Sequence, residues 1–111
     1  RIEDNIADNS GAAIVILGGK LTKIDNLDLR LVGMIFEENG EVISTGAGAA
    51  VLGNPAQAVA NLVNRWADFN IGLKAGDIVI SGTPVAAVPA EAGDSFNAIF
   101  DRLGTVSVSF S

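Results

Sequence analysis

Cysteine, histidine and tyrosine are absent from this sequence of 111 residues, which also contains one tryptophan and one methionine. Without cysteine the chain has no disulfide, no thiol nucleophile and no thiolate zinc site. Without histidine it has no Ser-His-Asp triad and no imidazole ligand for a metal. Acid–base chemistry would therefore fall to carboxylates, lysines, bound water or another chain.

Positive charge is also scarce: 7 Lys and Arg stand against 13 Asp and Glu, which gives a net charge of −6. Nucleic-acid binding normally needs a basic surface, so no nucleic-acid partner is expected. No apolar run approaches the roughly 18 residues of a membrane-spanning helix, and no charged-then-apolar leader precedes the first motif. We therefore expect a cytoplasmic protein without a membrane partner, whose acidic surface maintains solubility.

Hydrophobic residues make up 49% of the sequence, and their spacing predicts one α+β domain over residues 1–111, mostly β with one helix. Asn39-Gly40 between two β-prone runs favours a type I′ hairpin. Strands are predicted at 12–17, 29–37, 41–46, 77–81, 94–100 and 104–110.

The helix is predicted to begin at Gly53-Asn54-Pro55, since Asn54 can cap free N–H groups and Pro55 suits the first helical position. The helix is expected to end near Asn70, and its apolar face is formed by Val59, Leu62, Val63 and Trp66. The preceding run GAGAAVLG is not a phosphate loop, because Asn54-Pro55 replaces the required Lys-Ser/Thr. Its glycines are interpreted as permitting tight backbone passage.

The triplet Ala-Gly-Asp occurs at 75–77 and again at 92–94, and each copy is interpreted as a turn before a strand. The first strand runs into Ser81-Gly82-Thr83-Pro84. Gly82 permits close backbone approach, Thr83 offers a hydroxyl, and Pro84 ends the ladder because it has no N–H to donate. These residues favour either a plain strand end or a seat for an anion, and composition leaves both open.

Two further groups of polar residues can be interpreted either as structural or as functional. Asp8-Asn9-Ser10 is either an Asx turn or a cluster that holds a ligand's carboxylate or orients a water. The carboxylates of Glu37, Glu38 and Glu41 flank the hairpin turn, where side chains diverge, so solvated carboxylates are expected there rather than a metal site.

Four segments cover nearly the whole chain in this order: EDNIADNS, VGMIFEENGEVISTGAGAAVLGNPAQAVANL, LKAGDIVISGTPVAAVPAEAGDSF and LGTVSVSF. Together they resemble the carboxy-terminal portion of the 2-oxopent-4-enoate hydratase and 4-oxalocrotonate decarboxylase group, within the fumarylacetoacetate hydrolase superfamily. The resemblance implies a mixed β-sheet roll and a homo-oligomer. It also implies that residues 1–111 are the carboxy-terminal portion of a longer catalytic domain, completed by an amino-terminal segment of the same polypeptide.

The resemblance further implies a divalent cofactor, Mg²⁺ or Mn²⁺, which chelates a 2-oxo or 2-hydroxydienoic acid from aromatic meta-cleavage degradation. Such chelation stabilises the enolate-like charge that develops during hydration or decarboxylation. The family's metal-binding acids, a Glu-x-Glu pair and a further acid, lie upstream of the segment that matches Arg1, as does its active-site lysine. This chain is therefore expected to hold no metal ligand.

Site residues follow from the same resemblance. Asn9 and Ser10 are the implied catalytic residues, although their segment is one residue shorter than the family's Asp-Asn-Ala-Ser. Asp8, Gly82 and Thr83 are the implied substrate-binding residues, with Thr83 holding a carboxylate. The Gly-Thr-Pro form at 82–84 is more like the superfamily's hydrolases than its hydratases.

The hypothesis is a hydratase of 2-hydroxypenta-2,4-dienoate-type acids. One alternative is the sister 4-oxalocrotonate decarboxylase. The other, if 111 residues are the whole protein, is a metal-free binding or assembly module without catalytic activity.

Overall fold

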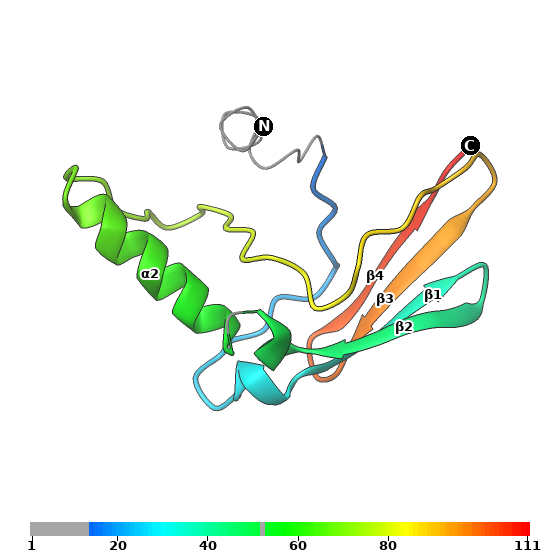
Figure 1. Ribbon diagram of the computed structural model, residues 1–111, viewed down its shortest axis with the longest axis horizontal. Helices are drawn as coiled ribbons and strands as arrows, with labels where there is room; N and C mark the ends of the chain where they lie inside the picture. The colour runs from blue at the N-terminus through cyan, green and yellow to red at the C-terminus, as the bar shows by residue number, and fades with distance from the viewer. Residues whose placement is uncertain (1–13, 52) are drawn as a thin grey trace.

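The computed structural model describes residues 14–51 and 53–111. The four strands form one antiparallel sheet of order β2-β1-β3-β4, and helix α2 lies apart from it at the other end of the molecule (Figure 1). In chain order the elements are the 3₁₀ turn η2 (Leu29–Leu31), β1 (Gly33–Glu38), β2 (Glu41–Ala47), the 3₁₀ turn η3 (Gly48–Ala50), α2 (Pro55–Ala67), β3 (Ser95–Phe100) and β4 (Gly104–Ser109). The α+β class is confirmed. Every strand pairing among the described residues is antiparallel, and the mixed roll stays a prediction.

Strands β1 and β2 meet at the predicted turn, where Asn39 and Gly40 have φ angles of 52° and 86°. Positive φ at both positions is what a type I′ hairpin requires. Strand β1 begins at Gly33 rather than near residue 29, because Asp28 stabilises a 3₁₀ turn first. Its carboxylate accepts the backbone N–H of Arg30 at 3.1 Å and forms a 2.6 Å ion pair with the Arg30 guanidinium.

Strand β1 also pairs with β3, which is far away in the sequence: Glu37 lies opposite Asn97, 60 residues later. Phe96 on β3 is only 5% exposed. Its ring stacks on Phe36 at 5.6 Å and meets the edge of Phe110 at 5.8 Å. This aromatic cluster joins the two hairpins into one sheet.

Strand β4 alternates between half-buried and exposed side chains. Val106 and Val108 are half-buried, whereas the intervening hydroxyl side chains are exposed. The strands predicted at 94–100 and 104–110 are therefore confirmed to within a residue at each end.

Two predicted strands are not formed in the described residues. The apolar side chains of 14–17 and 77–81 are largely exposed, with Ile14 at 83%, Ile78 at 62% and Ile80 at 60%. An apolar run becomes a strand only where a neighbouring strand receives its backbone hydrogen bonds. The four-stranded sheet does not pair with either segment. The strand predictions for 12–17 and 77–81 are thus wrong for these residues; positions 12 and 13 lie outside the described part.

Helix α2 begins as predicted. The Asn54 side chain accepts the N–H of Ala56 at 3.0 Å, and Pro55 occupies the first turn. The helix ends at Ala67, and Asn70 then takes a φ of 57°, which stops its continuation. No helix in the described part of the chain is long and apolar enough to cross a membrane.

Candidate functional site

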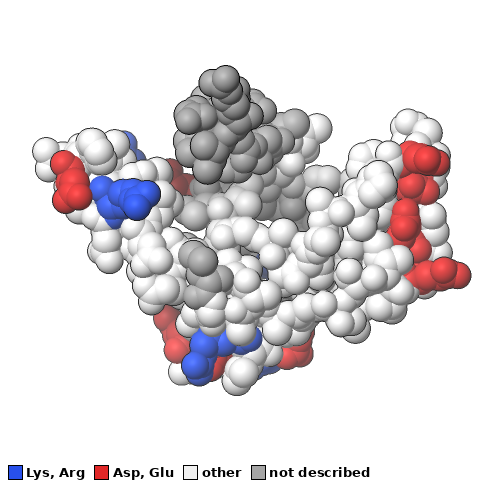
Figure 2. All heavy atoms as spheres, in the orientation of Figure 1, with Lys and Arg blue, Asp and Glu red and all other residues white. Residues whose placement is uncertain are grey.

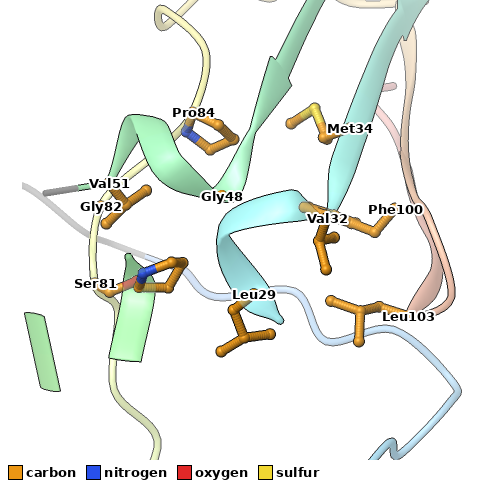
Figure 3. A pocket seen from close by; sticks show the side chains of 11 residues that line it. Leu29, Val32, Met34, Gly48, Val51, Ser81, Gly82, Pro84, Phe100 and Leu103 are labelled. Carbon is orange, nitrogen blue, oxygen red and sulfur yellow. The ribbon is translucent and has the colours of Figure 1, made fainter. Parts of the chain in front are cut away.

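A cavity of about 200 Å³ lies at the end of the sheet where β1 begins and β3 ends. Figure 3 shows the segment of Ser81 and Gly82 on one side and Phe100 and Leu103 on the other. Among the described residues that line it, Ser81 alone has a polar side chain and none is charged. The other lining residues are Leu29, Val32, Met34, Gly48, Val51, Pro55 and Pro84.

Backbone hydrogen bonds hold the cavity walls together around the start of β1. The carbonyl of Val32 accepts the N–H of Gly48 at 2.9 Å, and the carbonyl of Gly33 accepts the N–H of Asp101 at 2.9 Å. A Cβ at Gly48 would collide with the carbonyl oxygen of Leu29. The interpretation of this glycine as a site of tight backbone passage is confirmed.

Gly82 lies on the cavity wall with a φ of 125°, a conformation that side chains rarely adopt. A Cβ built there would be 3.6 Å from Cγ1 of Val51, which is 7% exposed. That distance is an ordinary van der Waals contact, so it is the positive φ of Gly82, and not crowding, that requires glycine here. The close backbone approach predicted for Gly82 stays a prediction.

Thr83 is exposed and does not line the cavity. Its hydroxyl donates to the carbonyl of Val85 at 2.8 Å and accepts the N–H of Val85 at 3.2 Å. Because a hydroxyl has one proton, a carboxylate would have to compete with Val85 for it. The structure thus places Gly82 on the cavity and gives the Thr83 hydroxyl a local turn partner.

The other expected site residues, Asp8, Asn9 and Ser10, lie outside the described residues. Their roles stay predictions.

The two Ala-Gly-Asp triplets form the same turn, as predicted. Gly76 and Gly93 have φ angles of 94° and 93°. The Asp77 carboxylate accepts the N–H of Lys74 at 2.8 Å, and Asp94 accepts the N–H of Glu91 at 2.9 Å. The repeated sequence therefore encodes a repeated turn.

Only the second turn is tied to the sheet, through Asn39. The Asn39 amide donates to Asp94 at 3.1 Å, and its oxygen accepts the N–H of Ser95 at 2.9 Å. The Glu91 N–H, and then the Asn39 amide, stabilise the charged carboxylate and lower the pKa of Asp94. The sequence pattern places Asn39 in the hairpin turn and carries no signal for this bridging role.

Acidic side chains gather at the end of the sheet farther from α2 (Figure 2). Glu37, Glu38 and Glu41 flank the Asn39-Gly40 turn at this end. Within residues 14–51 and 53–111, no three acidic side chains are arranged to hold a metal ion. The described residues therefore do not fit the divalent cofactor, and we derive no chemical step through it.

A sequence model of the family described as "Fumarylacetoacetate (FAA) hydrolase C-terminal" matches residues 4–110. The chain belongs to this family. Its fumarylacetoacetate hydrolase relatives include 2-hydroxyhexa-2,4-dienoate hydratase of Comamonas testosteroni, which is 39% identical over 100% of this chain and 42% of that protein. The 2-oxo-hept-4-ene-1,7-dioate hydratase of Escherichia coli is 40% identical over 99% of this chain and 41% of that protein.

A solved fumarylacetoacetate hydrolase relative is 4-oxalocrotonate decarboxylase from Pseudomonas putida G7, in complexes with calcium and acetate and with magnesium and adipate. It superposes with a TM-score of 0.88 at 40% identity, covering 96% of this chain and 41% of that one. Relatives that are hydratases and a decarboxylase confirm the expected group. The chain spans about two fifths of the length of these relatives.

Proposed function

We propose that this chain is the carboxy-terminal portion of a metal-dependent hydratase that acts on 2-hydroxypenta-2,4-dienoate-type 2-oxo acids in aromatic meta-cleavage degradation. The carrying observation is the position of Gly82 on an apolar cavity, in a chain whose relatives are hydratases and decarboxylases. In this proposal the chain supplies the wall that faces the substrate. Acids outside the chain hold Mg²⁺ or Mn²⁺, in keeping with the magnesium and calcium complexes of the solved relative.

The chain's own residues bind and orient the substrate. Asn9 and Ser10 orient the substrate or the water that adds to it, and Asp8 lies beside them. Thr83 presents its hydroxyl to the substrate's carboxylate, which replaces the Val85 carbonyl as acceptor. A divalent ion held by acids outside the chain would supply electrostatic stabilisation of the charge that develops on the 2-oxo acid.

The proposal includes a homo-oligomer. Large apolar side chains are exposed in the described residues, among them Ile14, Leu21, Ile78 and Phe69. We interpret these exposed side chains as contact positions for other protein segments. The remainder of a longer polypeptide and a second copy of the chain are both expected to cover it.

Sequence identity does not choose between hydratase and decarboxylase, because the hydratases stand at 39% and 40% and the decarboxylase at 40%. The sister decarboxylase is therefore the second candidate. A metal-free module is the third, and it applies only if the gene encodes these 111 residues and no more.

The test uses the complete polypeptide that the gene encodes, purified with Mg²⁺ and incubated with 2-hydroxypenta-2,4-dienoate or with 4-oxalocrotonate. We expect water addition to the dienoate and no CO₂ from 4-oxalocrotonate. Release of CO₂ would assign the decarboxylase instead, and inertness toward both acids would support the module.

A further inference from the structure

The lining of the cavity beside Gly82 is suited to hydrocarbon. We propose that this cavity receives the uncharged end of the substrate and rejects acids that carry a second carboxylate at that end. The inference rests on the proposed function, which makes the Gly82 segment part of the substrate wall. It adds a specificity for monocarboxylic 2-oxo acids.

The described walls of the cavity are apolar. Met34 and Val32, on the β1 side of the cavity, are 7% and 5% exposed, and Phe100 and Leu103 face the Ser81 segment (Figure 3). A carboxylate that leaves water for such a site loses its hydration and gains no charged partner from the described lining residues. A methyl or vinyl group loses nothing and buries apolar surface instead.

Two arginines are sequence neighbours of lining residues, and the Lys20 ammonium donates to the carbonyl of one of them, Arg102, at 3.0 Å. Arg30 follows Leu29, but its guanidinium pairs with Asp28 at 2.6 Å. Arg102 precedes Leu103, but its Nε pairs with Asp101 at 2.9 Å. Both guanidinium groups are therefore already matched by a neighbouring acid at the surface, and neither arginine lines the cavity.

The size of the cavity also suits a short hydrocarbon chain. The cavity of about 200 Å³ is several times the roughly 30 Å³ that one water occupies in the liquid. It has room for a short hydrocarbon chain that displaces water. Each added methylene that is buried there should tighten binding about fourfold.

The test compares two ligands that share a 2-oxo acid head and five carbons, 2-oxopentanoate and 2-oxopentanedioate. Their binding to the complete polypeptide with Mg²⁺ is measured by titration calorimetry. We expect 2-oxopentanoate to bind at least about tenfold more tightly, because only the diacid must bury a charge. Equal binding, tighter binding of the diacid, or no binding of either ligand would overturn the proposal.

This measurement needs no turnover, so its outcome is distinct from that of the activity assay. A preference for 2-oxopentanoate in a protein that hydrates no dienoate supports the cavity's specificity and contradicts the proposed hydratase. Hydration of the dienoate without a preference between the two ligands supports the proposed hydratase and contradicts the cavity's specificity.

A variant pair assigns the preference to this cavity. Leu103 is half-buried on its wall. Leu103→Arg places a cation there and should reverse the preference, whereas the matched control Leu103→Met should keep it. A folded Leu103→Arg protein that retains the original preference would overturn the assignment. The ligand pair on the unmodified protein remains decisive if Leu103→Arg does not fold.

Discussion

The carbonyl oxygen of Pro84 lies against the backbone of Gly46, so closely that a Cβ at position 46 would be 2.6 Å from it. Gly46 belongs to the edge strand β2, and Pro84 follows directly on the segment that carries Gly82. The contact therefore packs the Gly82–Pro84 part of the cavity wall against edge strand β2. It depends on the absence of a side chain at position 46.

Gly46→Ala should displace the Pro84 segment and destabilise the protein by about 1–3 kcal/mol, as overpacking against backbone usually does. Weaker binding of 2-oxo acids should accompany it. Urea denaturation and ligand titration of the complete polypeptide measure the two effects. Gly33→Ala is the matched control on the neighbouring strand β1, because nothing lies within 4 Å of its Cβ. Equal losses in the two variants would contradict the role given to the Gly46–Pro84 contact.

Asn39 contributes to stability in two separable ways: its backbone adopts a φ of 52°, and its side chain bridges Asp94 and Ser95. Asn39→Gly removes the bridge but accepts the backbone conformation. Asn39→Ala removes the bridge and adds strain of about 1 kcal/mol. We therefore expect the alanine variant to have the lower free energy of unfolding. Equal values would show that the left-handed backbone is not retained.

The stability of the protein should fall in acid through Asp94. Its hydrogen bonds lower its pKa below the ordinary 3.8, so the folded state holds the charged form more strongly than the unfolded state does. The contribution is complete above the unfolded pKa and is lost as pH falls through the folded one, below about 4.

Asp94→Asn should flatten this acid dependence of the urea midpoint without abolishing it. Asp28 acts with the same sign, because its hydrogen bond to Arg30 also lowers its pKa. An unchanged acid limb in Asp94→Asn would contradict the contribution of Asp94.

Variants at Thr83 distinguish a role in substrate binding from a role in the local turn. Thr83→Val removes the hydroxyl that bonds Val85, and Thr83→Ser retains it. If Thr83 holds a substrate carboxylate, the valine variant should raise KM by about tenfold or more, while serine stays near the original. Steady-state kinetics and thermal unfolding of both variants decide the matter. A fall in melting temperature with an unchanged KM would assign Thr83 to the turn alone.

Local signals in the sequence predicted the local structure. Asn39-Gly40 and Asn54-Pro55 act through the conformations of their own backbones and immediate neighbours, and the hairpin and the helix start are where they were expected. The turns at 75–77 and 92–94 show what such local signals do not predict, namely which turn leads into a paired strand. Both contain Ala-Gly-Asp, yet only the turn at 92–94 leads into a strand. Asp94 is held by Asn39, which brings Ser95 to β1, and no such link joins Asp77 to the sheet.

For the candidate site, too, the sequence predicted the local feature and not the long-range one. Gly82 could be identified because a glycine and a proline that follow an apolar run indicate an unusual backbone conformation, and its φ is 125°. The opposite wall could not, since Met34 and Phe100 become partners only through pairing of β1 with β3. Nothing in the spacing of the sequence specifies that order of strands.

The pairing of β1 with β3 also dictates a sequence of events during refolding. Each hairpin closes a short loop, but aligning Glu37 with Asn97 closes one of 60 residues, which is entropically harder and slower. Gly82 lies inside that loop, so its wall can be completed only after the two hairpins have docked. Recovery of ligand affinity should therefore coincide with protection of the β1 and β3 amides from exchange, and lag behind formation of the Asn39-Gly40 hairpin.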